Sequence, residues 1–167
     1  MKQITKFFAF AIVMVALTTT AFAQNSATAT ASATIVAPIA ISRTSHLNFG
    51  NVTAGTGTVI LTPIPLGRTV TGTVALLPAS PGPVAAATFT VTGVASATYT
   101  ITLPGTITVT DGSTTMNVDT WTCNYSPGLI GTIDGTSLSL GATLHVTAAN
   151  AVGPYTSANF TVTVNYN

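Results

Sequence analysis

Apolar and polar residues alternate one by one along much of this chain. Phe160 to Tyr166 reads Phe-Thr-Val-Thr-Val-Asn-Tyr, and Tyr99 to Leu103 reads Tyr-Thr-Ile-Thr-Leu. Because successive side chains of a β-strand point to opposite faces, this spacing gives strands with one apolar and one polar face. No stretch after residue 24 has apolar residues at the 3.6-residue spacing of a helix. The pattern therefore predicts an all-β protein.

Short strand-like runs follow one another and are separated by Gly, Pro, Asn and Asp. The runs are Leu47–Phe49, Gly57–Leu61, Val70–Leu76, Ala87–Val91, Thr98–Leu103, Thr106–Thr110, Met116–Cys123, Ser137–Thr147 and Ala158–Tyr166. Asp111-Gly112 and Asp134-Gly135 predict tight hairpin turns, since these residues adopt positive φ readily. The proline-rich stretch Pro78 to Pro83 predicts an exposed loop. Seven to nine short strands of this kind predict an antiparallel, immunoglobulin-like β-sandwich.

An extended N-terminal strand is predicted before this sandwich. From Ala27 to Ile35 every odd residue is apolar and every even residue is Thr or Ser, so Ala27, Ala29, Ala31, Ala33 and Ile35 share one face. Such a strand needs a sheet edge. Three alternatives stay open: it pairs with another copy of the chain, it pairs with its own domain, or it is a linker.

The first 23 residues resemble a secretory signal peptide. Lys2 and Lys6 precede an apolar stretch from Phe7 to Leu17, and Ala21-Phe22-Ala23 gives a small-residue cleavage site. We therefore expect an exported protein, extracellular or on the cell surface, without a transmembrane segment in the mature chain. The expected organisation is a signal peptide (1–23), an N-terminal extension with a hinge at Pro38 (24–43) and a sandwich domain (44–167).

Charged residues are rare after residue 23. Lys and Glu are absent there, and the charges are Arg43, Arg68, Asp111, Asp119 and Asp134. Ordinary domains have about a quarter charged residues. A surface so poor in charge favours association, and two arginines do not make a nucleic-acid surface.

Candidate catalytic groups are equally few. His46 and His145 lie far apart in the sequence and lack the spacing of a metal site, and no Gly-x-Ser-x-Gly motif marks a nucleophile. Cys123, at strand spacing from Trp121 and Tyr125, is expected to be a buried apolar residue, with an intermolecular disulfide as the alternative. We therefore expect no catalytic, cofactor or metal site, and a protein that is not an enzyme.

The last strand-like run suggests an edge that could accept another strand. Phe160, Val162, Val164 and Tyr166 share one apolar face, and open edges recruit further strands. With the alternating tail before them, these residues predict assembly by strand addition.

Several of these features together mark a resemblance. They are the signal peptide, the Ala/Thr tail, Leu47-Asn48-Phe49-Gly50 and the terminal Phe-Thr-Val-Thr-Val-Asn-Tyr. The chain resembles small secreted bacterial β-proteins of unassigned function, which are similar to spore-coat-U-like and archaic chaperone–usher pilin subunits. The resemblance implies an incomplete sandwich that the next subunit's tail completes. It also implies a periplasmic chaperone and an outer-membrane assembly protein as partners.

Two functions follow as hypotheses. The first is a non-catalytic structural subunit of an extracellular filament, pilus or coat, which polymerises with copies of itself by N-terminal donor-strand exchange. The second is a monomeric exported binding module for carbohydrate or another surface ligand. Its candidate residues are the aromatic side chains Trp121, Tyr125 and Tyr155.

Overall fold

The computed structural model describes residues 25–150 and 152–167, and the predicted signal peptide lies outside the described residues. The chain divides into two units, Met1–Ile35 and Val36–Asn167. In the first unit, residues 25–35 carry no strand assignment and their side chains are exposed, Ile35 to 99%. The second unit, which we call the body, holds every strand found in the described residues.

Thirteen strands and no helix are found in the described residues. In chain order they are β1 (Ala40–Ser45), β2 (Asn48–Phe49), β3 (Gly57–Thr62), β4 (Gly67–Val70), β5 (Val84–Ala85), β6 (Ala87–Thr92), β7 (Thr98–Thr102), β8 (Ile107–Thr110), β9 (Thr115–Cys123), β10 (Ile130–Thr132), β11 (Leu138–Val146), β12 (Thr156–Ser157) and β13 (Thr163–Tyr166). Correspondingly, no helix in this part of the chain is long and apolar enough to cross a membrane.

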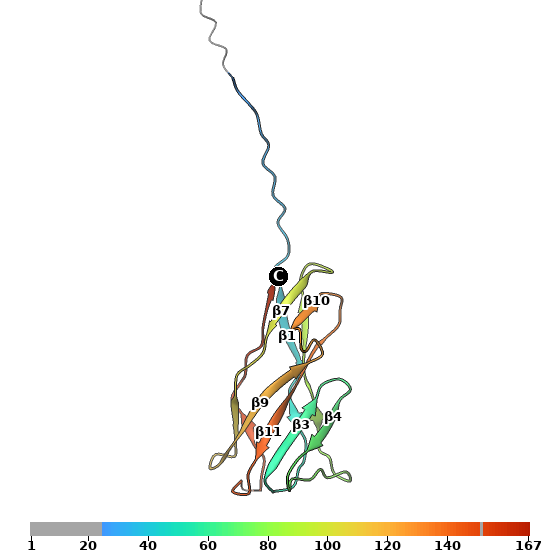
Figure 1. Ribbon diagram of the computed structural model, residues 1–167, viewed down its shortest axis with the longest axis vertical. Coiled ribbons are helices and arrows are strands. Elements are labelled where there is room, and N and C mark those ends of the chain that lie inside the picture. Colours follow the sequence, from blue (N-terminus) through green and yellow to red (C-terminus); the bar gives the residue numbers. More distant parts are fainter. Residues whose placement is uncertain (1–24, 151) are drawn as a thin grey trace, which may run out of the picture. The chain divides into compact units, whose positions relative to one another are not determined.

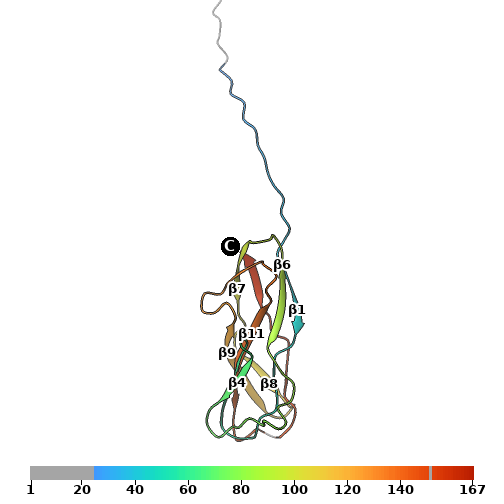
Figure 2. The ribbon, with the colours of Figure 1, turned by 90° about the vertical axis from the view of Figure 1, so that its right-hand side faces the viewer.

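The strands form two principal antiparallel sheets. The larger sheet has the order β1-β6-β11-β9-β8-β12, and β3 pairs with both β11 and β4. The smaller sheet has the order β10-β7-β13, and β2 and β5 form a separate pair. Figure 2 shows β6 and β1 on one side of the body and β7 on the other. The predicted all-β antiparallel sandwich is confirmed.

Two clusters of buried side chains make up the core. The first lies between the two sheets and is built by alternate residues of β6, β7, β11 and the segment that contains β13, among them Phe89, Tyr99 and Val164. The second lies on β3, β9 and β11 and includes Val59, Val118 and others. No buried member of the second cluster comes from β7, β10 or β13 within the described residues. The smaller sheet therefore covers only part of the larger one.

Several predicted strands differ from those observed. The run Ala158–Tyr166 forms a ladder only over Thr163–Tyr166, because β12 pairs with β8 in the larger sheet while β13 pairs with β7 in the smaller one. Residues 158–162 therefore cross from one sheet to the other. The run Val70–Leu76 is in a strand only at Val70, since the chain turns at Gly72, where φ is 72°.

The turns and the N-terminal boundary also bring corrections. Gly112 has the expected positive φ in the β8–β9 hairpin. Gly135 has positive φ too, but its turn joins β10 to β11, which lie in different sheets, so it is not a hairpin. Residues 40–43, assigned to the extension by sequence, belong to β1 and pair with β6 because Ile39 and Ile41 pack against the first cluster.

Candidate functional site

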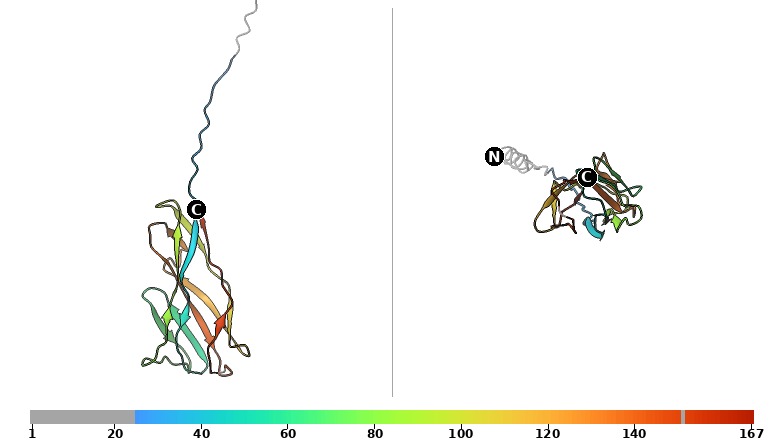
Figure 3. Two further views of the ribbon diagram at one scale, coloured as in Figure 1. Left: turned by 180° about the vertical axis from the view of Figure 1, so that it is seen from behind. Right: turned by 90° about the horizontal axis from the view of Figure 1, so that it is seen from below.

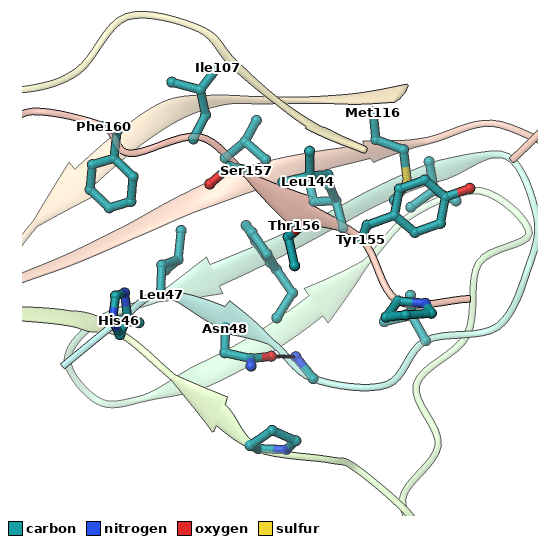
Figure 4. Close-up of a pocket in the computed structure, with 18 of the residues that line it drawn as sticks. His46, Leu47, Asn48, Ile107, Met116, Leu144, Tyr155, Thr156, Ser157 and Phe160 are labelled. Atoms are coloured by element: carbon teal, nitrogen blue, oxygen red, sulfur yellow. Dashed lines mark hydrogen bonds between the residues drawn. The ribbon is translucent and has the colours of Figure 1, made fainter. Parts of the chain in front are cut away.

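A groove of about 1190 Å³ lies over the second cluster, where the smaller sheet does not reach (Figure 4). Its floor is apolar and comes from alternate residues of β8, β9 and β11, because side chains two apart in a strand share a face. Cross-strand register places Ile107 beside Val118, Val109 beside Met116, and Leu144 beside Val118. These pairs make one continuous apolar surface across three strands.

One wall of the groove comes from β1, β2 and the loop between them. Ile41, Leu47 and Phe49 line it, together with Arg43 and His46. No Asp or Glu is among the lining residues of the described chain. The lining therefore carries no carboxylate, and Arg43 and His46 lie at its β1–β2 side.

The sequence Leu47-Asn48-Phe49-Gly50 builds this wall locally. The Gly50 N–H donates to the Asn48 Oδ1 at 2.8 Å (Figure 4), which closes a tight turn. Gly50 has φ of 68°, and a side chain there would overlap the Pro81 carbonyl. The Arg68 guanidinium donates to the carbonyls of Phe49 and Asn51, at 2.5 and 3.1 Å. These bonds hold Leu47 and Phe49 against the core.

The opposite wall is the segment from Tyr155 to Val162. Residues 158–162 belong to no strand ladder in the described chain, although Phe160 is half-buried and Val162 is buried, as alternate residues of a strand would be. The Phe160 ring packs on Trp121 of β9, with ring centroids 4.8 Å apart. The segment is thus held in place by its side chains while its backbone remains outside any sheet.

Each wall is continuous with an edge strand, the first with β1 and the second with β13, which follows Val162. Among the described residues, β1 pairs with β6 on one side and β13 pairs with β7 on one side. These two strands approach each other at one end of the body (Figure 3, left), and β1 and the segment before β13 border the groove further along. An added strand would find an apolar floor below it and free edges beside it.

The predicted acceptor residues divide into two groups. Phe160 and Val162 line the groove. Val164 is buried in the first cluster opposite Ile101, and Tyr166 pairs with Tyr99 beyond the groove. The predicted donor residues Ala27, Ala29, Ala31, Ala33 and Ile35 are all exposed.

The three aromatic residues of the alternative ligand site do not share one surface. The Trp121 indole N–H donates to the Gly105 carbonyl at 3.0 Å, and its ring covers Phe160. Tyr155 lines the groove, and its hydroxyl lies 2.6 Å from the Thr114 Oγ1. Tyr125 packs edge-on against Tyr99 in the first cluster.

The titratable groups take structural positions. Cys123 is buried, as expected. The His145 Nε2 lies 2.8 Å from the Asp119 carboxylate, which also accepts from Thr120; these hydrogen bonds lower the pKa of Asp119. The pair joins β11 to β9 where the register shifts and Thr120 has positive φ, so it fastens a bulge. Within the described residues no three His, Cys, Asp or Glu side chains gather as metal ligands would.

The sequence did not predict the groove itself. Its floor residues read as ordinary alternating strands, and only the sheet order shows that the second layer ends above them. Leu47-Asn48-Phe49-Gly50 was a local signal for the wall, since an Asn two residues before a Gly is typical of a side-chain-capped turn.

Fold and groove together define an antiparallel β-sandwich with an open apolar groove beside free strand edges. The chain belongs to the family described as Domain of unknown function (DUF4402), whose model matches residues 39–166. No curated protein and no solved structure gives a significant match. The matched region begins just before β1 and includes every strand of the body.

Proposed function

We propose that this chain is a non-catalytic structural subunit of an extracellular filament, pilus or coat that polymerises by N-terminal donor-strand exchange. Residues Ala27–Ile35 of one copy would lie in the groove of another, and the body would be an incomplete immunoglobulin-like sandwich. The observation that carries the proposal is the groove, bordered by residues 158–162, which extend along it without a ladder partner.

The groove offers what an added strand requires. Backbone groups at a free edge supply hydrogen bonds, and an apolar floor accepts every second side chain of the incoming strand. Phe160 and Val162 already alternate toward the core. A strand laid beside them would extend the smaller sheet over the second cluster and cover its apolar residues.

The tail offers what such a groove requires. Its alternation gives one apolar face, and no residue from 25 to 35 carries a charged side chain. At about 3.3 Å per residue it reaches about 30 Å. Ile35 is 99% exposed, and burying such a side chain contributes about 1.5–3 kcal/mol. The tail therefore has one large apolar side chain, Ile35, at the end of a strand whose other apolar side chains are small.

Export and assembly partners form part of the same proposal. The signal-like segment supports passage through a bacterial periplasm. A pilin-like route would add a periplasmic chaperone and an outer-membrane assembly protein, which keep the free edge covered until a second copy arrives.

Charge placed on one face of the tail tests the exchange. Ala29→Asp with Ala31→Asp puts two carboxylates on the apolar face, where burial is costly. Thr30→Asp with Ser32→Asp adds the same charge to the polar face and is the matched control. Filaments of the mature chain would be followed by negative-stain electron microscopy and sedimentation. We expect the alanine-face variant to stay monomeric and the control to polymerise.

Other outcomes are decisive in the opposite sense. Filaments from both variants would show that the tail is not the donor strand. Loss of filaments in both would show that the effect of charge is not specific to the apolar face. A mature chain that never polymerises would contradict the proposal outright.

A peptide complementation experiment tests the groove separately. Trp121 is the single tryptophan of the chain and packs on Phe160 at the groove wall. Added to the monomeric alanine-face variant, a peptide of residues 25–36 should change the Trp121 emission saturably. A peptide with the two alanine-face aspartates should leave it unchanged.

The binding-module hypothesis remains as a second candidate because Tyr155 lines the groove. A sugar held there would stack on its ring. Titration of Trp121 fluorescence with a panel of glycans tests this function. Saturable responses to a glycan, together with no response to the tail peptide, would favour it over strand exchange.

A further inference from the structure

The hydroxyl of Tyr166 joins three segments of the body. It accepts a hydrogen bond from the Val94 N–H at 2.7 Å and donates one to the Ala37 carbonyl at 3.0 Å. Val94 follows β6 and Ala37 precedes β1, and both strands belong to the larger sheet. Tyr166 itself lies on β13 of the smaller sheet. A single side chain thus fastens the two sheets together.

The neighbouring Gly93 leaves space for this arrangement. A methyl group at Gly93 would overlap the Tyr166 hydroxyl and come within 2.9 Å of Ile133. The tyrosine ring therefore lies directly over the backbone that follows β6. Glycine is required here by the close approach of a side chain.

The contact lies at one end of the groove. Ile41 of β1 and Val162, just before β13, still line the groove, whereas Ala37 and Tyr166 are not among its lining residues in the described chain. The strands β1 and β13 come together at this end (Figure 3, left). The bonds of Tyr166 therefore fall where β1 and β13 meet, just beyond the end of the groove.

We infer that Tyr166 is a positioning residue that clasps the start of β1 to β13 and so sets the spacing of the two groove edges. The clasp consists of Tyr166, Val94 and Ala37. It assigns a structural role to the Tyr166 hydroxyl, whereas the sequence pattern placed Tyr166 only on an apolar face. Its consequence for tail binding rests on the proposed function, but the clasp itself does not.

Protease access to β1 tests the clasp. Trypsin must open β1 to cut at Arg43, which is paired with Phe89. Tyr166→Phe removes both hydrogen bonds and keeps the ring. We expect it to raise the rate of Arg43 cleavage about tenfold, the factor that about 1.4 kcal/mol gives. Gly93→Ala, which displaces the ring, should act in the same direction.

A second measurement needs no variant. In hydrogen exchange of the native protein, the Val94 amide should be protected, because the Tyr166 oxygen accepts from it. Asp119→Asn is the control for general destabilisation, since its hydrogen bond with His145 lies outside β1, β13 and the groove lining. An unprotected Val94 amide, or an Arg43 rate that rises equally in Asp119→Asn, would overturn the clasp.

The tail peptide separates the clasp from the proposed function. A clasp that fixes the groove edges in advance should strengthen peptide binding, so Tyr166→Phe should weaken it several-fold, whereas Asp119→Asn should not. If the wild-type groove binds no peptide while Arg43 cleavage still rises in Tyr166→Phe, the proposed function fails and the clasp stands. If binding is unchanged in Tyr166→Phe, the clasp does not position the groove.

Discussion

Truncation of Phe160 is the most direct test of the wall that borders the groove. The ring is half-buried and packs on Trp121, with centroids 4.8 Å apart. A fully buried Phe→Ala change costs about 3–5 kcal/mol. Half of that is about 2 kcal/mol, and the aromatic pair adds about 0.5–1.5 kcal/mol. We therefore expect Phe160→Ala to destabilise the body by about 2.5–3.5 kcal/mol.

Urea unfolding followed by Trp121 fluorescence measures this loss, at a protein concentration at which the chain is monomeric. With the slopes typical of small domains, about 1–3 kcal/mol per molar urea, the midpoint should fall by about 1–3 M. The fluorescence emission maximum of the folded protein should also shift to longer wavelength, because Trp121 becomes more exposed to solvent when the Phe160 ring is removed. Thr161→Ala, at the exposed neighbouring position, is the control and should change stability by less than about 0.5 kcal/mol. Equal effects of the two changes would refute the packing of this segment on β9.

Three further predictions concern single side chains. Hydrogen bonds from His145 lower the pKa of Asp119, so the stabilisation that they give is present above the ordinary aspartate pKa of about 4 and is lost as the pH falls below it. Asp119→Asn should therefore lessen the fall in melting temperature on the acid side. The Tyr99 hydroxyl is buried without a hydrogen-bond partner in the described chain, and burial raises its pKa. Tyr99→Phe should therefore raise the free energy of unfolding by about 1 kcal/mol in urea, and a loss would show that the hydroxyl is bonded. Gly50→Ala should cost about 1–3 kcal/mol in the same assay because of its positive φ, whereas Gly105→Ala, with open space around it, should cost little.

The sequence predicted the fold class because strand periodicity is local. Phe89 and Val91 of β6, and Tyr99 and Ile101 of β7, point into the first cluster as their alternation requires. The same rule failed for the run from 158 to 166. Its alternation continues without a break, but the chain passes from the larger sheet to the smaller one. Alternation records which side chains are buried, and it says nothing about where the backbone finds partners.

The groove could not be predicted for a related reason. Its floor residues Val118 and Leu144 carry the same pattern as the covered strands, and only the order of strands shows that no member of the smaller sheet lies over them. The Tyr166 clasp was also hidden. Tyr166 forms hydrogen bonds with the backbone groups of Ala37 and Val94, and a pattern of side chains in the sequence does not predict such bonds.

The charges of the tail and of the groove indicate which interactions would drive a contact between them. The tail from 25 to 35 has no charged side chain, and the groove lining contains Arg43 and His46 but no carboxylate in the described chain. A contact between them would depend on backbone hydrogen bonds and apolar burial, which salt screens little. The alanines bury little surface each, so Ile35 and the edge at residues 158–162 must supply most of the free energy. Assembly should then survive high salt but yield to urea, which solvates both apolar and peptide groups.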